Sequence, residues 1–361
     1  MQAREARLAA VLEAMAAAAP SREPAVLRAF REALAQRRVS QAAALVPDLE
    51  QAAMLEEAYA LLREARRDLA DSEAARSLSG TLAPRAMQAR ARREALGQMD
   101  ARRTSVRFAY AKRSPALDFE SGDLHRILLT ALRLEGLLLA LDLGQHPRPL
   151  LQLGPPLPAG VGGEEEWGEA VFRLPPGDAG PLLARLALRL PEGFVLHRWE
   201  EQPAYATAVA ELADAAEWSW PCPPECLEAA RARVQMFLAA EHFLWDRSGK
   251  VGGQKQEKTV DLRPLVATMD WEGARLRVTT PMRTFGATNP LKALGGILGL
   301  PPEAIRGLVR TRLQLRADPR LAQGERFEPK LRNLYEDAVM LSGGSNITLI
   351  EDDDEEPMRL G

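Results

Sequence analysis

The chain has little cysteine and no long apolar run. Only two of its 361 residues are cysteines, Cys222 and Cys226, which is too few for a disulfide framework and favours a reducing compartment. No stretch approaches 18 consecutive apolar residues, so a membrane-spanning helix is not expected. Glu5 and Glu13 fall where a signal peptide needs an apolar centre. The sequence therefore predicts a cytoplasmic protein without a membrane partner.

Signatures of common catalytic sites are missing as well. There is no Gly-x-Ser-x-Gly nucleophile turn, no phosphate loop ending in Gly-Lys-Ser/Thr and no Gly-x-Gly-x-x-Gly fingerprint. The nearest glycine-rich basic stretch, KVGGQK at 250–255, is interpreted as a hairpin loop. A zinc site could combine the two cysteines with His197 and His242, but structural zinc sites usually show paired short spacings. The sequence predicts no metal and no cofactor.

Basic and acidic residues are unevenly distributed, although the formal net charge is only −3. Residues 85–113 hold nine basic and two acidic side chains, and clustered arginines could follow a phosphate backbone while Phe108 and Tyr110 stack on bases. The candidate nucleic-acid residues are Arg92, Arg93, Arg102, Arg103, Arg107, Lys112 and Arg113. In the alternative interpretation the segment is a solvated linker and both aromatic side chains point into the core. The acidic residues 351–361 could compete with RNA for this basic face.

Composition divides the chain into four regions. Residues 1–100 are rich in Ala, Arg, Glu and Leu, which predicts a helical domain. From Thr104 strand and helix patterns alternate, which predicts an α+β fold with two ferredoxin-like lobes at 104–221 and 222–320. Residues 321–361 are expected to form a loosely ordered acidic tail.

The helical region leaves two interpretations open. Apolar residues recur at helical spacing, which is typical of a hairpin or small bundle. The heptad of Leu55, Leu62 and Leu69 would also suit a dimerising coiled coil, and therefore a homodimer. A structural adaptor, bound to its partner through these helices, is a further alternative.

Residues 144–161, GQHPRPLLQLGPPLPAGV, hold five prolines, which fix φ and remove backbone donors. We call this stretch the proline segment. It is interpreted either as an edge strand with its tight connection or as a preorganised binding surface. The candidate binding residues are His146, Arg148, Gln152, Gly154, Pro155 and Gly160 in the segment and Glu166 and Trp167 after it. An enzyme using His146 as a general base with Glu166 or Glu169 is the catalytic alternative.

Five stretches occur in one order: HPRPLLQLGPPLPAGV (146–161), EEEWGEAVF (164–172), TVDLRPLV (259–266), NPLKAL (289–294) and TRLQL (311–315). Through them, residues 106–317 resemble the radical SAM-linked protein family, a bacterial domain of unknown function found fused to or encoded beside radical SAM proteins. Where that family carries Ser-His-Leu-Asp, this chain reads ESGD at 120–123. The resemblance implies a radical SAM protein as a partner.

A radical SAM cluster itself needs three cysteine thiolates, so this chain with two cannot hold one alone. We therefore expect a non-catalytic accessory module that acts with a radical SAM or RNA-modifying enzyme, or on RNA itself.

Overall fold

The computed structural model describes most of the chain. The described residues are 2–65, 69, 72–95, 104–142, 148–203, 205–251, 254–282 and 290–323. None of the helices in these ranges has the length and apolarity that crossing a bilayer requires.

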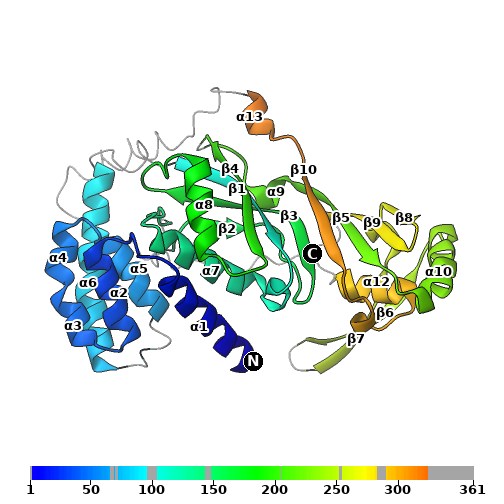
Figure 1. Ribbon diagram of the computed structural model, residues 1–361, viewed down its shortest axis with the longest axis horizontal. Coiled ribbons are helices and arrows are strands. Elements are labelled where there is room, and N and C mark those ends of the chain that lie inside the picture. Colours follow the sequence, from blue (N-terminus) through cyan, green and yellow to red (C-terminus); the bar gives the residue numbers. More distant parts are fainter. Residues whose placement is uncertain are drawn as a thin grey trace, which may run out of the picture. The chain divides into compact units, whose positions relative to one another are not determined.

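Five helices near the N-terminus share one apolar core (Figure 1). They are α2 (Ala25–Ala35), α3 (Val39–Ala44), α4 (Val46–Gln51), α5 (Leu55–Ala65) and α6 (Glu73–Ala95). Leu55, Leu62 and Leu69 are all buried in this core, so the leucine heptad is used within the chain. The preceding helix α1 (Gln2–Ala17) instead contributes Leu8 and Met15 to the core of the neighbouring α+β region.

The first α+β module has ferredoxin-like connectivity. In chain order it contains β1 (Thr104–Lys112), α7 (Ser121–Leu134), β2 (Leu151–Leu153), β3 (Gly162–Phe172), α8 (Ala179–Arg189) and β4 (Phe194–Gln202). Its strands lie in the order β4-β1-β3-β2, which is the βαββαβ arrangement predicted from the sequence. Residues of β1, β3 and β4 pack against α7 and α8 in one core.

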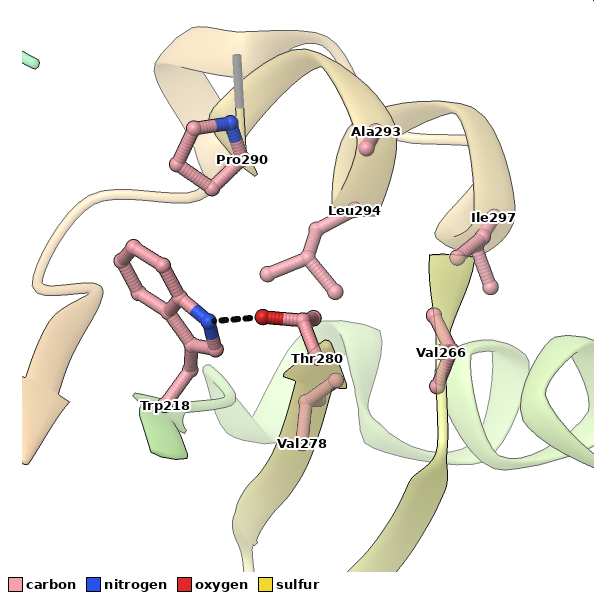
Figure 2. Close-up of a pocket in the computed structure, with 8 residues that line it drawn as sticks. All are labelled: Trp218, Val266, Val278, Thr280, Pro290, Ala293, Leu294 and Ile297. Atoms are coloured by element: carbon pink, nitrogen blue, oxygen red, sulfur yellow. Dashed lines mark hydrogen bonds between the residues drawn. The ribbon is translucent and has the colours of Figure 1, made fainter. Parts of the chain in front are cut away.

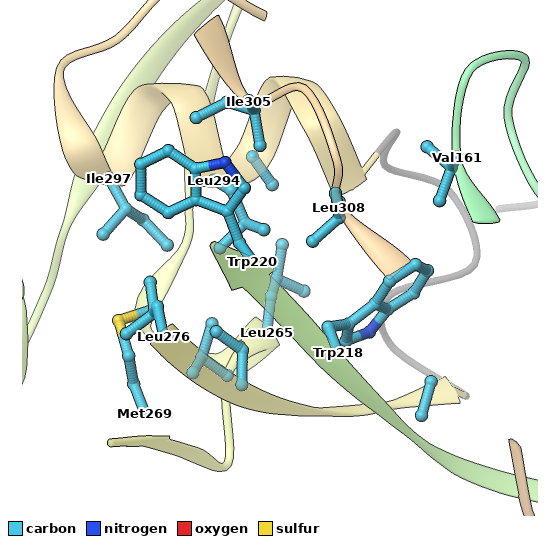
Figure 3. Packing of buried hydrophobic residues seen from close by; sticks show 14 of the residues in the cluster. Val161, Trp218, Trp220, Leu265, Met269, Leu276, Leu294, Ile297, Ile305 and Leu308 are labelled. Atoms are coloured by element: carbon cyan, nitrogen blue, oxygen red, sulfur yellow. The ribbon is translucent and has the colours of Figure 1, made fainter. Parts of the chain in front are cut away.

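A second module repeats this arrangement. It contains β5 (Ala213–Pro221), α10 (Leu227–Ala239), β8 (Thr268–Glu272), β9 (Arg275–Pro281), α12 (Pro290–Leu298) and β10 (Val309–Leu315), with strand order β10-β5-β9-β8. Trp218 and Trp220 of β5 lie at the centre of its core, among Met269, Leu276 and Ile297 (Figure 3). The predicted α+β fold, a helical region followed by two ferredoxin-like units, is thus confirmed.

The two modules form one eight-stranded sheet. β10 runs parallel to β3 and pairs Val309 with Gly162 and Arg310 with Gly163 (Figure 1). β2 pairs with the other end of β3, opposite 168–170, so both strands share one edge of β3. The expected lobe boundary at 221 falls after β5, whereas the topology makes β5 the first strand of the second module.

Smaller elements connect and extend the two modules. The short helices α9 (Val209–Leu212) and α13 (Pro319–Gln323) flank β5 and β10 along the chain. The strands β6 (Leu244–Val251) and β7 (Gln254–Asp261) form a separate two-stranded sheet inserted between α10 and β8. Because Val251 pairs with Gln254, the stretch KVGGQK closes a β-hairpin, as the sequence predicts.

Candidate binding site

The sheet has two faces with different chemistry. Along β3, Ala170 and Phe172 point into the core under α7 and α8, so alternation places Glu165 and Trp167 on the other face. Arg310 bonds Glu166 on the helix side and also covers Trp218, which lies beneath α12. The helix pairs of both modules therefore cover the same face. We call the opposite one the outer face.

The outer face carries a cleft of about 440 Å³ at the junction of the two modules. It is lined by Glu165, Trp167, Arg198, Arg312, Leu313, Gln314 and Leu315. This volume lies within the range of small-molecule sites, roughly 300–1,000 Å³. The cleft is thus large enough for a ligand, and it needs both modules to form.

Arg198 reaches the cleft from β4 across the small residue Ala109 of β1. Ala109 pairs with Arg198 on one side and with Trp167 on the other. With only a methyl group between them, the Arg198 guanidinium lies over the Trp167 indole, 5.0 Å from the ring centroid. This contact is a cation–π interaction.

Both guanidinium groups in the cleft are weakly paired. Arg198 Nη1 lies 3.4 Å and Arg312 Nε 3.8 Å from Glu165, and Arg198 Nε lies 3.8 Å from Glu200, so both cations are paired only at long distances. The side chains of Arg198 and Arg312 are 45% and 60% exposed. Exposed pairs of this kind contribute about 0–1 kcal/mol. An anionic ligand therefore faces little competition for either arginine.

The proline segment is bound to β3 through its backbone. The Gly154 N–H donates to the Trp167 carbonyl at 2.7 Å, and a Cβ at position 154 would lie only 2.8 Å from that oxygen. Gln152 is exposed in β2, and Arg148 is exposed before it. The described part of the segment is an edge strand with a tight connection, which is the first of the two sequence interpretations. His146 lies outside the described residues.

Glu166 lies on the helix side and is 1% exposed. Arg310 donates from Nε at 2.8 Å and also from Nη2 to this carboxylate, while Nη2 bonds the Pro155 carbonyl at 2.6 Å. Gly163 makes room, since a Cβ there would lie 2.5 Å from Glu166 Oε1. Burial raises the pKa of the Glu166 carboxyl, and Arg310 opposes this shift. Glu166 and Pro155 thus come together in a closed junction of the modules.

Glu169 is also occupied by the fold. Its carboxylate accepts a hydrogen bond from the Val209 N–H, at the start of α9. Burial raises the pKa of Glu169, whereas the Val209 bond and the nearby Arg107 lower it. Gly160, the last glycine of the proline segment, has φ +79° and donates its N–H to the Leu117 carbonyl. Glu169 and Gly160 therefore hold connecting segments in place beside the sheet through hydrogen bonds.

The predicted basic face is divided by the fold. Arg107 is 8% exposed and donates to the Thr207 carbonyl at 2.9 Å, while Lys112 is fully buried. Phe108 and Tyr110 lie in the core, as the alternative interpretation expects. These four side chains therefore present nothing to a phosphate backbone.

The remaining basic candidates have different surroundings. Arg92 is exposed on α6, and Arg113 donates from Nε to Glu164 at 2.8 Å. Arg102 and Arg103, the side chain of Arg93 and the acidic residues 351–361 lie outside the described residues.

Lys112 makes the stability of the fold depend on pH. Its Nζ donates to the Pro158 carbonyl at 3.3 Å, and burial lowers its pKa from 10.5 to about 8. Between pH 8 and 10 the unfolded chain therefore binds more protons at this position than the folded chain, so this residue makes the free energy of unfolding rise with pH.

We expect Lys112→Met to remove this rise, because methionine does not titrate. Urea unfolding at pH 8, 9 and 10 gives the free energy of unfolding of both proteins. The difference between wild type and variant should increase with pH. Lys292→Met, at an exposed lysine of α12, is the control and should leave the pH profile unchanged. Parallel profiles of wild type and Lys112→Met would contradict the assignment.

A second cavity lies inside the second module (Figure 2). It is lined by Trp218, Val266, Val278, Thr280, Pro290, Ala293, Leu294 and Ile297 and has a volume of about 10 Å³, the space of one water molecule at most. Trp218 Nε1 donates to Thr280 Oγ1 at 2.8 Å, which satisfies the polar groups drawn there. This cavity is a packing void and is too small for a ligand.

Metal-binding side chains do not gather in the described ranges. Within them, no group of three or more His, Cys, Asp or Glu residues could hold a metal ion. Cys222 is buried and Cys226 half-buried, and burial raises the pKa of the Cys222 thiol.

Sequence reasoning found Trp167 but missed Arg198 and Arg312. A β-bulge explains the first omission: Ala109 pairs with Arg198 and Tyr110 with Leu196, so His197 is an extra residue in β4. The bulge places Arg198 on the face opposite Leu196, although the two are two positions apart. Arg312 enters the cleft because β10 returns to lie beside β3 and because a register shift at Thr311 turns Arg312 to the face opposite Arg310.

The fold defines an α+β protein of two ferredoxin-like modules that share one sheet and form a cleft where they meet. The chain belongs to a family of uncharacterized proteins conserved in bacteria, DUF2344, whose sequence model matches residues 105–290. The matched range covers the first module and most of the second. No curated protein matches the chain.

Proposed function

We propose that this protein is a non-catalytic binding module that binds RNA through the outer-face cleft and acts beside a radical SAM or RNA-modifying enzyme. The observation that carries the proposal is the pair of exposed, weakly paired arginines beside a tryptophan in the 440 Å³ cleft.

The chemistry of the cleft suits one nucleotide of an unpaired RNA strand. A guanidinium group pairs with phosphate through two parallel hydrogen bonds, which Arg312 has the exposure to make. Arginine planes also stack on unstacked bases, and Arg198, which lies over the buried Trp167 ring, would offer its opposite face to a base. Leu313 and Leu315 add apolar surface to the same cleft. An anionic ligand with a planar ring therefore matches the lining.

The enzyme partner is inferred from the resemblance to the radical SAM-linked family. The matching stretches at 146–161 and 164–172 lie in and beside β2 and β3, which support the cleft. Because the chain has only two cysteines, the cluster chemistry would belong to the partner. In this proposal the module holds RNA while the partner carries out the reaction.

We expect the double variant Arg198→Ala, Arg312→Ala to weaken RNA binding by about tenfold or more, since hydrogen bonds to charged groups contribute about 1.5–3 kcal/mol each. Fluorescence anisotropy with a labelled single-stranded RNA measures the dissociation constant. Both side chains are largely exposed, so the fold should be unaffected.

A matched control removes two arginines elsewhere. Arg76 and Arg306 are exposed outside the cleft, so Arg76→Ala, Arg306→Ala makes the same change in net charge. An equal loss in both double variants would assign binding to overall charge and refute the cleft. Absence of RNA binding by the wild-type protein would refute the proposed function.

A further inference from the structure

We propose that the outer-face cleft selects guanine and that the Glu165 carboxylate is the group that recognises this base. The inference rests on the proposed function and deepens it, since it names the base that the cleft takes from an RNA strand. It is supported by the position of Glu165 between the two arginines and by the hydrogen bond that occupies Glu217, the carboxylate beside Gln314.

A carboxylate in the cleft is unfavourable for a phosphate ligand alone. Glu165 is the one acidic side chain among the described residues that line the cleft. It lies 3.4 Å from Arg198 Nη1 and 3.8 Å from Arg312 Nε, and neither contact is short enough for a strong hydrogen bond. The Glu165 carboxylate repels phosphate and reduces the attraction of both arginines for it. A ligand that brings hydrogen-bond donors to this carboxylate turns the penalty into a favourable contact.

The carboxylate of Glu217, on β5, is already used by the fold. It accepts a hydrogen bond from Nε2 of the cleft residue Gln314. Because an ionised carboxylate only accepts, this bond fixes which end of the Gln314 amide faces Glu217. Glu165 is therefore the carboxylate that can meet a base in the cleft.

Guanine is the RNA base that presents two adjacent donors to a carboxylate. On its Watson–Crick edge the N1–H and the N2 amino group lie side by side, and they match the two oxygens of a carboxylate. Adenine and cytosine place a ring acceptor beside their amino group, and uracil places its N–H between two carbonyl groups. In those bases an acceptor would face a carboxylate oxygen, which costs affinity. Unpaired bases are recognised on this edge, so Glu165 favours guanine.

A base stacked on Arg198 lies next to Glu165. The Arg198 guanidinium has one face on the Trp167 ring, 5.0 Å from its centroid, so the opposite face is the one that a base would use. Since Arg198 Nη1 lies 3.4 Å from the carboxylate, the edge of that base comes within reach of Glu165. Arg312, also beside Glu165, would bind the phosphate. Stacking, edge recognition and phosphate binding thus use three different side chains.

The test compares labelled RNAs of about nine nucleotides, within the site sizes of single-strand binding proteins. They are uridine strands with guanosine, inosine or adenosine at the central position, together with the all-uridine strand. Inosine keeps N1–H but lacks the N2 amino group, so it removes one of the two donors. By fluorescence anisotropy, we expect the wild type to bind the guanosine strand about tenfold or more tighter than the adenosine strand, with the inosine strand between them.

We expect Glu165→Gln to lose selectivity and to gain affinity for the all-uridine strand. A carboxamide presents one acceptor and one donor, a pattern that matches adenine, so the preference for guanosine should disappear or reverse. Removal of the charge also strengthens both arginines as phosphate ligands, so the all-uridine strand should bind up to about fivefold tighter. A merely structural role of Glu165 would not produce this gain. Unchanged selectivity of the variant would refute the inference.

The matched control is Glu200→Gln. Glu200 lies 3.8 Å from Arg198 Nε, its side chain is 52% exposed, and it is not among the described residues that line the cleft. The control therefore removes the same charge beside the same arginine. It should keep the preference for guanosine. Equal loss of selectivity in both variants would assign the effect to net charge and refute recognition by Glu165.

Three outcomes separate this inference from the proposed function. If the wild type binds all the strands with equal affinity, the selection of guanine is refuted while RNA binding stands. If it binds guanosine monophosphate and none of the strands, guanine recognition is supported and the proposed function is wrong. If it binds neither the nucleotide nor any strand, both proposals are refuted.

Discussion

Replacing Glu166 by alanine is expected to lower the free energy of unfolding by about 3–5 kcal/mol, the cost of leaving a buried charge without its partner. Glu166 and Arg310 are each about 1% exposed, and the carboxylate takes hydrogen bonds from Nε and Nη2 of the guanidinium. Without it Arg310 keeps only the Pro155 carbonyl and the face of Trp218. Nearby Lys112 would lose the same opposing charge.

Urea unfolding at pH 7 measures this effect. Glu165→Ala changes the neighbouring residue, whose side chain lies on the outer face and is 26% exposed, and it should cost less than about 0.5 kcal/mol. Glu166→Gln preserves the shape of the side chain and an acceptor oxygen, so its loss in free energy of unfolding should fall between those of the two alanine variants. Equal destabilisation by the alanine variants at 165 and 166 would show that the buried pair is not what holds β3 to β10.

Arg189→Ala is expected to be the second severe change, with a loss of about 3–5 kcal/mol. Arg189 ends α8 and is 2% exposed. It donates to Glu135 Oε1 at 2.7 Å, to the Ala19 carbonyl at 2.9 Å and to the Pro20 carbonyl at 2.7 Å. Weaker bonds reach the carbonyls of Met15 and Leu134. One guanidinium thus satisfies the C-terminal carbonyls of α1 and α7, where a cation is favoured.

The matched control for this prediction is Arg185→Ala, one helical turn earlier. Arg185 also bonds Glu135, at 3.0 Å, but its side chain is 32% exposed. Arg185→Ala should lower the free energy of unfolding by about 1 kcal/mol, because water can replace part of the hydrogen bonding that the partly exposed Arg185 provides to Glu135. Thermal unfolding followed by circular dichroism compares the two variants. A Tm for Arg189→Ala as high as that of the control would refute the role of Arg189 in joining the three helices.

The pattern of apolar residues along the chain is sufficient to predict the strands and helices of the first module. In 104–112, Val106, Phe108 and Tyr110 share one face, which the structure buries. The same alternation puts Lys112 on that face, so its burial could have been read from the sequence. Its membership of a cluster of basic residues suggested an exposed position instead, because charge clusters are usually solvated.

The cleft was beyond sequence reasoning for two physical reasons. Simple alternation in 194–202 puts Arg198 on the face of Leu196, and only the bulge at His197 reverses it. Arg312 and Trp167 are brought together by the parallel pairing of β3 with β10, which no local pattern encodes. Similarly, the expected boundary at 221 places residues 213–221 in the first lobe, although the strand they form, β5, pairs with β9 and β10.

The order in which β3 and β10 leave the ribosome has a consequence for biosynthesis. Glu166 and Arg310 are separated by 144 residues, which take roughly 7–30 s to translate at about 5–20 residues per second. During that time the Gly162 end of β3 has no β10 to pair with. An unpaired strand edge is a template for aggregation, so nascent chains that stop before residue 309 carry that hazard and complete chains close it.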